Sequence, residues 1–158
     1  MSSKATFLIG SILILIFLSA CQTRQNGAVL FNASILNHAD SPETVIKKMG
    51  EKPDTSFFRL IIGKPRYIQM YDQLDSAEFR FAHNKLIEVI VHKPDFPFAD
   101  STISKFGLPY KKHTQMDSSA YIMWKNVYKN LEVVNFYLVG SKQDNRSERY
   151  KIYFKLKQ

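Results

Sequence analysis

An apolar run near the N-terminus decides how much of this chain can take part in a folded domain. Residues 5–18 are mostly apolar, follow a start whose only charge is Lys4, and lead to Ala20 and the chain's only cysteine, Cys21. A basic start, an apolar run of about 7–15 residues and small residues at its end are typical of a secretory signal peptide. We therefore predict cleavage between Ala20 and Cys21, which removes residues 1–20.

Two other interpretations of this run stay open. A transmembrane helix needs about 20 apolar residues, and this run is shorter and contains Gly10 and Ser11. A signal peptide without lipid attachment would leave Cys21 as an unpaired thiol in an oxidising compartment, where it would form intermolecular disulfides. Attachment of a lipid explains a single cysteine at the cleavage site better.

The sequence Leu-Ser-Ala-Cys at residues 18–21 resembles the lipobox of bacterial lipoproteins. The resemblance implies that the Cys21 thiol carries a diacylglycerol and that the new amine is acylated after cleavage. More than one acyl chain gives stable membrane attachment. In bacteria with two membranes, Gln22 in place of an aspartate implies the outer membrane, with the domain facing the periplasm.

The chain that remains after cleavage has the length of a single domain. Apolar residues make up 45% of the sequence, with 12 Phe and 8 Tyr, so a compact core is expected and a disordered stalk is not. We expect a lipidated flexible tether over residues 21–40 and one domain over 41–158. Within the tether, the apolar residues 28–31 suit a short strand.

The net charge of +8 indicates anionic partners. Nucleic acid is the usual partner of a basic surface, but an exported protein meets little of it, so none is expected. Anionic lipid head groups, worth about 1 kcal/mol per nearby basic residue, and acidic envelope proteins are the expected counter-charges. The alternative that the lysines only keep the domain soluble stays open.

The clearest helix signal begins at Ser41. Ser41, Pro42 and Glu43 suit the N-cap, the first position and the first turn of a helix. Gly50 suits its C-terminal cap, so the helix is predicted over residues 42–49.

Two further short helices are predicted. One covers residues 102–106, with Asp100 as a cap residue before it and a glycine after it. The other covers residues 57–62, where the following Gly-Lys-Pro favours a helix although the same apolar residues also suit a buried strand. Residues 66–76 are expected to be a connector.

Alternation of polar and apolar residues predicts antiparallel strands in the rest of the domain. The clearest hairpin joins residues 77–81 and 86–91 through a turn at 82–85. Its apolar side chains would face the core and its charged ones water: Phe79, Phe81, Ile87, Val89 and Val91 inward, and Glu78, Arg80 and Glu88 outward. The other predicted strands are 119–124, 131–139 and 150–156, with a polar loop at 140–148.

The two halves of the domain, about 41–93 and 99–158, form a candidate tandem repeat. The predicted fold class is therefore α+β, an antiparallel sheet with two or three short helices on one face, arranged as a tandem repeat of helix–strand–strand units. One register aligns the Gly-Lys-Pro at residue 63 with the Gly-Leu-Pro 44 residues later, and a rival register aligns residues 43–50 with the segment 57 residues later. Both registers stay open.

This order of elements is similar to that of a known group. The Gly-Leu-Pro at 107–109, the aromatic strand 121–124 and residues 131–136 resemble the fold shared by the small lipoprotein of the outer-membrane β-barrel assembly machinery and the β-lactamase inhibitor proteins. The resemblance implies helices on one face of an antiparallel sheet and binding of proteins without catalysis. It implies no site residues, because the motif with which that group contacts phosphatidylglycerol and its partners is absent.

The sequence lacks motifs for catalysis or metal binding. His38, His83, His92 and His113 are scattered and have no metal-binding spacing. A Gly-rich phosphate loop, Gly-x-Ser-x-Gly and Ser-x-x-Lys are all missing. We predict no enzyme activity, no metal and no cofactor other than the acyl groups on Cys21.

Loop residues and exposed aromatic side chains are the remaining candidates for function. The candidate binding surface consists of Tyr110, Lys111, Lys112, His113, Tyr121 and Trp124. Either Tyr121 or Trp124 would be an exposed interface anchor, unless Trp124 is simply the largest residue of the core.

These observations lead to two candidate functions. The first is a non-enzymatic, membrane-anchored envelope lipoprotein that acts as a protein-binding or accessory assembly module. The alternative is a sensor or carrier that holds a small amphipathic ligand between its helices and its aromatic strands. A closed core with a flat aromatic patch favours the first, and a lined cavity of about 300 Å³ or more favours the second.

Overall fold

The computed structural model describes residues 29–92, 94, 96–118, 120–139 and 149–158. The predicted signal peptide, the lipidation site Cys21 and the loop at 140–148 lie outside these residues. No helix within the described residues is long and apolar enough to cross a membrane.

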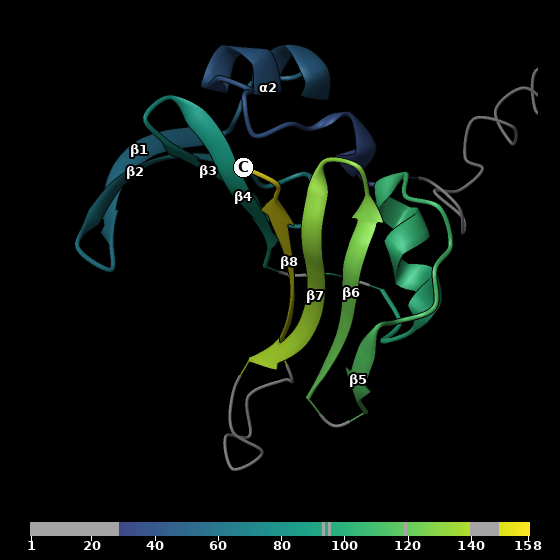
Figure 1. The fold of residues 1–158 in the computed structure, drawn as a ribbon. Coiled ribbons are helices and arrows are strands. Elements are labelled where there is room, and N and C mark those ends of the chain that lie inside the picture. Colours follow the sequence, from purple (N-terminus) through teal and green to yellow (C-terminus); the bar gives the residue numbers. More distant parts are fainter. Residues whose placement is uncertain (1–28, 93, 95, 119, 140–148) are drawn as a thin grey trace, which may run out of the picture.

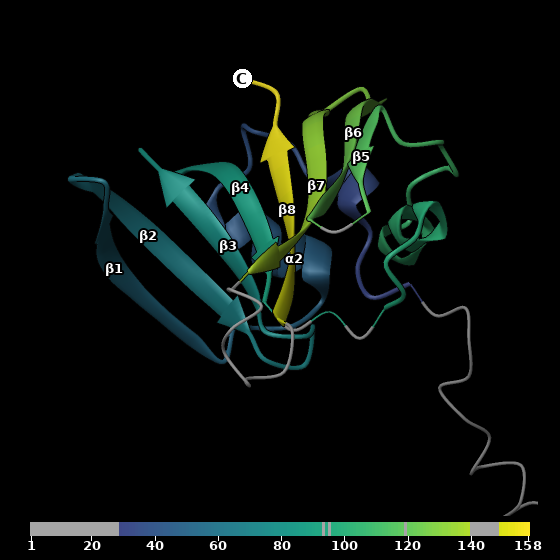
Figure 2. The ribbon, with the colours of Figure 1, turned by 90° about the horizontal axis from the view of Figure 1, so that it is seen from below.

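Eight antiparallel strands form one open sheet, which confirms the predicted antiparallel sheet (Figures 1 and 2). Their order is β1-β2-β3-β4-β8-β7-β6-β5, so the first four and the last four strands meet where β4 pairs with β8. The strand bounds are β1 Thr55–Ile61, β2 Lys64–Tyr71, β3 Ala77–Ala82, β4 Lys85–Val91, β5 Gln115–Asp117, β6 Tyr121–Tyr128, β7 Leu131–Val139 and β8 Arg149–Leu156.

Three short helical segments accompany the sheet in the described part of the chain: η1 Ala33–Ile35, α2 Pro42–Met49 and η2 Asp100–Phe106. The prediction of α2 is confirmed in detail. The Ser41 hydroxyl accepts a backbone N–H of the first turn, and Gly50 ends the helix in the left-handed conformation at φ 76°.

The prediction that Asp100 caps the second helix was wrong. The N-cap of η2 is Ala99, which makes no side-chain cap bond, and the segment is a 3₁₀ helix. The Asp100 carboxylate instead accepts the backbone N–H of His113 at 2.9 Å. This tertiary contact ties the connector after η2 back to its first residue.

The prediction of a helix over residues 57–62 was also wrong. Residues 57–61 belong to β1, and residues 66–71 of the expected connector belong to β2. The two strands are joined by Ile62 at φ 50° and Gly63 at φ 69°, both positive as a two-residue type I′ hairpin turn requires. Gly63 therefore makes a hairpin turn and does not end a helix.

The predicted hairpin at residues 77–91 is confirmed as β3 and β4. Its turn consists of His83 and Asn84, which both have positive φ. A register shift in this pair places Phe81 opposite Leu86. As a result Leu86 is buried in the core and Ile87, predicted there, is only half-buried.

Aromatic rings between the helical segments and the sheet form the centre of the core. The ring centroid of Phe106 lies 4.8 Å from that of Phe154 and 5.2 Å from that of Phe31. Val45 of α2 and Ile103 of η2 belong to the same buried cluster. Residues 29–31 are not a strand, but Phe31, assigned by the sequence to the tether, is part of this core.

Candidate functional site

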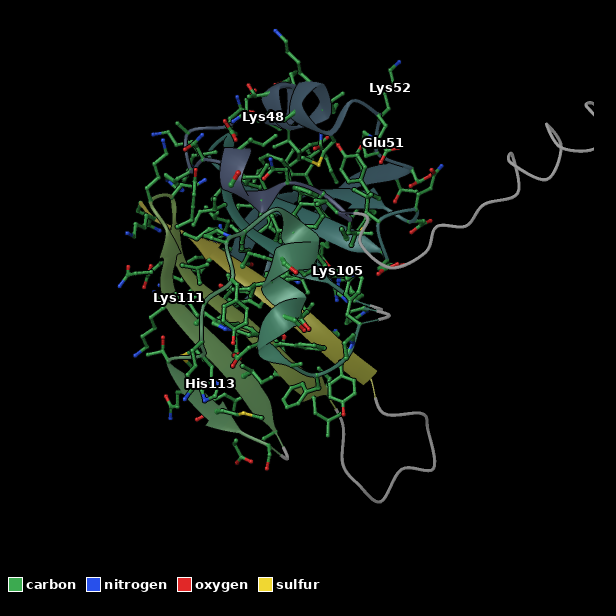
Figure 3. All side chains as sticks on the ribbon, turned by 90° about the vertical axis from the view of Figure 1, so that its right-hand side faces the viewer. Lys48, Glu51, Lys52, Lys105, Lys111 and His113 are labelled. Carbon is green, nitrogen blue, oxygen red and sulfur yellow. The ribbon has the colours of Figure 1, made fainter. Side chains whose placement is uncertain are left out.

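The connector between η2 and β5 exposes part of the predicted binding surface. Tyr110 is 68% exposed, Lys112 is exposed, and Lys111 and His113 are half-buried. Figure 3 shows Lys111 and His113 along the segment that runs beside η2. Only two of these four side chains are therefore free to contact a partner fully.

Lys111 and His113 bind within the domain. The Lys111 ammonium group donates to the backbone carbonyls of Lys125 and Asn126, at 2.9 and 3.1 Å. The His113 Nδ1 atom lies 3.0 Å from the Asp100 carboxylate. These contacts explain both side chains by the structure of the connector.

Trp124 is not an exposed anchor, and the alternative of a core residue is the correct one. Its side chain is fully buried, and Nε1 donates to the carbonyl of Lys111 at 3.0 Å. Tyr121 lies three positions earlier on the same strand, so it points to the opposite face of the sheet and is half-buried. The six predicted residues therefore do not form one surface.

A different surface, on the β1–β2 hairpin, carries the large apolar side chains with the highest exposed fractions among the described residues. Phe58 is 78% exposed, Leu60 is 72% exposed, and Ile62 in the turn is 95% exposed. Phe58 lies directly opposite Tyr67, with ring centroids 5.1 Å apart, and Leu60 lies opposite Pro65. We call Phe58, Leu60, Pro65 and Tyr67 the apolar face of the hairpin, with Ile62 at its tip.

The other face of the same hairpin carries three cations, together with Phe57, which is 41% exposed, and Ile61. Arg59 lies directly opposite Arg66, and Lys64 shares their face by the alternation of the strand. Among the residues that the structure describes, no acidic side chain pairs with any of the three. We call Arg59, Lys64 and Arg66 the basic face of the hairpin.

The hairpin also forms an open edge of the sheet. β1 is the outermost strand, seven residues long, and Figure 1 shows it at the far end of the sheet from η2. The opposite edge strand, β5, has only three residues. Long apolar edges are normally shortened, charged or covered, because their unpaired N–H and C=O groups invite another strand. The exposed β1 edge is therefore a candidate docking site.

An open groove lies between the hairpin and α2. Its volume is about 390 Å³, and its lining is mainly apolar and aromatic. The Tyr67 ring contacts those of Phe58 and Phe81, so the hairpin's apolar face continues into the groove. The lining residues are Pro42, Glu43, Phe58, Pro65, Tyr67, Phe81, His83 and Asn84.

The sheet face away from the helical segments holds a polar cluster that the sequence placed in water. Glu78 is only 4% exposed, and Arg80 lies between Glu78 and Glu88 with ion pairs to both carboxylates. The Nε2 atom of His92 lies 2.6 Å from Glu78, and the hydroxyl of Tyr153 donates to Glu88 at 2.7 Å. The prediction of solvent-facing charges was wrong because these side chains pack together and bind one another, His92 and Tyr153.

Electrostatics show that this cluster is internally satisfied. Burial raises the pKa of Glu78, but hydrogen bonds from His92 and Arg80 outweigh it and lower the pKa to about 2. Burial and the hydrogen bond to Glu88 raise the pKa of Tyr153. The Glu78 carboxylate stays ionised and the Tyr153 phenol stays protonated, and the contacts of the cluster join β3, β4 and β8.

Sequence reasoning missed the hairpin because the run at 57–62 lacks a clear period and suits burial in either a helix or a strand. Its only signal for a hairpin was Gly63, which the sequence analysis assigned to the end of a helix.

Among the described residues, no group of three or more histidine, cysteine, aspartate or glutamate side chains could hold a metal ion.

No known protein family, curated protein or solved structure matches this chain.

Proposed function

We propose that this protein is a non-enzymatic lipoprotein of the cell envelope that docks on another protein through its β1–β2 hairpin. The observation that carries this proposal is the exposure of Phe58, Leu60 and Ile62 on an open edge strand. Contiguous exposed apolar side chains on a folded domain mark interaction sites, and large apolar residues anchor protein interfaces when a partner covers them.

The proposed membrane anchor is Cys21, in line with the lipobox-like residues 18–21. The core residue Phe31 lies ten positions after Cys21, and a chain of that length spans at most about 35 Å. An anchored domain would thus stay next to the membrane, and so would its partner. A labelled fatty acid fed to growing cells should label the natural chain and not Cys21→Ala, and labelling of neither would contradict the anchor.

The proposed fold class is α+β with two repeated units, and the resemblance to the assembly-machinery lipoprotein and the β-lactamase inhibitor proteins implies helices on one face of the sheet. α2 and η2 each end at a glycine with positive φ, Gly50 and Gly107, and each precedes four strands. These glycines are 57 residues apart, whereas Gly63 lies in a hairpin turn. The register of 57 therefore joins equivalent elements, and the unit is a helix with four strands in place of helix–strand–strand.

A ligand carrier is the second candidate, and the groove of about 390 Å³ favours it. The groove exceeds the size of about 300 Å³ at which binding of small molecules becomes common. Organic extraction of the purified chain, followed by mass spectrometry, would identify a bound amphipathic molecule. A chain that carries no such molecule when it is purified from its own cells would contradict the carrier function.

Crosslinking in intact cells tests protein docking. A photoreactive amino acid at Leu60 should join the chain to one protein, whereas the same group at Met116, which is 43% exposed on the opposite edge, should not. The protein identified must also bind the purified chain and lose this binding with Leu60→Ser plus Ile62→Ser. Equal adducts at both positions, or binding that survives the double substitution, would contradict docking through the hairpin.

A further inference from the structure

We infer that the partner of the hairpin is an extended protein segment with alternating acidic and apolar side chains, which binds by adding a strand to β1. This inference rests on the proposed function and specifies the chemistry of the partner. It uses the free edge of β1 and the different character of the two hairpin faces.

The edge position of β1 determines which side chains of an added strand would lie on each face of the sheet. A strand that pairs with β1 lies about 4.8 Å from it and places successive side chains on opposite faces of the sheet. Its residues on one side would lie beside Phe58 and Leu60, which are largely exposed. Its residues on the other side would lie beside Phe57, Arg59 and Ile61, which share one face by the alternation of the strand. Apolar side chains suit the first set of positions.

The charge of the Arg59 face determines which side chains suit the second set of positions in the added strand. Arg59 and Arg66 lie directly opposite each other, and like charges in such a cross-strand pair are destabilising. Lys64 adds a third positive charge to the same face, and no acidic side chain in the described part of the chain forms an ion pair with it. A carboxylate beside Arg59 would form a charge-assisted hydrogen bond and relieve this repulsion. Phe57 and Ile61 share this face, but the only charged residues of the hairpin on it are the three cations, so acidic side chains suit the second set of positions, above all beside Arg59.

A second copy of this chain fits the edge poorly. If two β1 strands paired in antiparallel fashion about a two-fold axis, the basic faces of both copies would lie on the same side of the joined sheet. The Arg59 residues of the two copies would then lie on the same side of neighbouring strands, and no acidic side chain among the described residues pairs with them. The like charges would oppose this pairing.

An anionic bilayer fits the edge less well than a protein strand does. Basic and apolar side chains together suit head groups and hydrocarbon, but β1 also presents unpaired backbone N–H and C=O groups along its outer edge. Open sheet edges do not occur in hydrocarbon, because nothing there can satisfy those groups. A protein strand satisfies the backbone and the charges together.

Binding of short peptides to the full chain, held in nanodiscs of zwitterionic lipid, tests this inference. The probes are labelled seven-residue peptides, matching the length of β1: one alternates Val and Glu, one Val and Lys, and one Ser and Glu. Fluorescence anisotropy should show that the Val–Glu peptide binds roughly tenfold or more tightly than the other two. Hydrogen exchange in residues 55–61 should slow when it binds.

Charge reversal provides the specific control. Arg59→Glu plus Arg66→Glu should reverse the preference, so that the Val–Lys peptide binds more tightly than the Val–Glu peptide. Lys112→Glu plus Lys129→Glu changes the net charge by the same amount at exposed positions away from the hairpin and should leave the preference unchanged. Circular dichroism should show that both variants are folded.

The outcomes separate this inference from the proposed function. If Leu60 crosslinks to a partner but the peptides bind without charge preference, strand addition by an acidic segment is overturned and protein docking stands. If the chain does not bind the Val–Glu peptide but binds phosphatidylglycerol vesicles through Arg59 and Arg66, the hairpin is a lipid-binding site and the inference is also overturned. A reversal of preference that the control variant shares would overturn it as well.

Discussion

Glu78 Oε2 lies 2.6 Å from His92 Nε2, and the same carboxylate also binds Arg80. The contact joins β3 to the residue that follows β4, on the sheet face away from the helical segments. The side chain of Glu78 is only 5% exposed. A buried carboxylate of this kind is stable only while its partners remain in place.

Stability should fall in acid because of Glu78. Its pKa is lowered from 4.5 to about 2 in the folded protein, so its contribution is fully present above about pH 5 and disappears as the pH falls toward 2. The free energy of unfolding should drop by on the order of 2–3 kcal/mol over this range. Urea unfolding at several pH values measures this drop. Glu78→Gln should flatten the profile, and an unchanged acid slope in that variant would rule out Glu78 as its origin.

Arg80→Met should destabilise the domain strongly. The substitution leaves Glu78 and Glu88 without their shared cation, and removal of one partner from a buried ion pair costs about 3–5 kcal/mol. Lys155→Met is the matched control, because Lys155 and Glu132 form a pair in which both side chains are over 40% exposed. It should cost less than about 1 kcal/mol. Similar losses for both variants, measured by urea unfolding, would disprove the buried role of Arg80.

Two glycines with positive φ should respond differently to alanine. Gly50 has φ 76° and no atom within 4 Å of an added Cβ, so Gly50→Ala should cost about 1–2 kcal/mol from backbone strain alone. Gly107 has φ 64°, and an added Cβ would lie 2.6 Å from the Asn32 Oδ1 atom. Asn32 caps η1, so Gly107→Ala should cost at least about 1 kcal/mol more than Gly50→Ala. Thermal unfolding compares them, and equal shifts would mean that Asn32 moves freely.

Trp124 should behave as a core residue. Trp124→Ala should cost about 3–5 kcal/mol, because it empties a fully buried site. Trp124→Phe keeps most of the ring and should cost less, although the Lys111 carbonyl loses its indole donor. Tyr110→Ala, at a 68% exposed position, should change stability by less than about 0.5 kcal/mol. A Trp124→Ala variant as stable as Tyr110→Ala would contradict this assignment.

Local signals correctly predicted several elements. Ser41, Pro42 and Gly50 marked both ends of α2, and the alternation around His83 and Asn84 marked the β3–β4 hairpin. These signals work because capping and turn formation depend on residues only a few positions apart. The apolar run of β1 contains no such signal apart from its turn, so its conformation could not be predicted from the run itself.

In the candidate site, too, some features follow from neighbouring residues and others depend on the tertiary structure. Tyr110 and Lys112 are exposed as loop residues usually are, and the sequence predicted this correctly. The sequence did not show that β1 lies at an edge, since that depends on which strands pair across the sheet. Phe58 and Leu60 are residue types typical of a core, and they form a surface because nothing in the described part of the chain packs over them.

The sequence by itself determined the antiparallel hairpin of β3 and β4, the helix at residues 42–49 and the basic character of the chain, because each has its cause in neighbouring residues or in composition. Only the tertiary structure decided that Glu78 is buried, that Trp124 is covered by the connector and that β1 is exposed. Burial and strand order arise from contacts between segments far apart in the chain, such as β4 and β8. No short stretch of sequence contains both partners of such a contact.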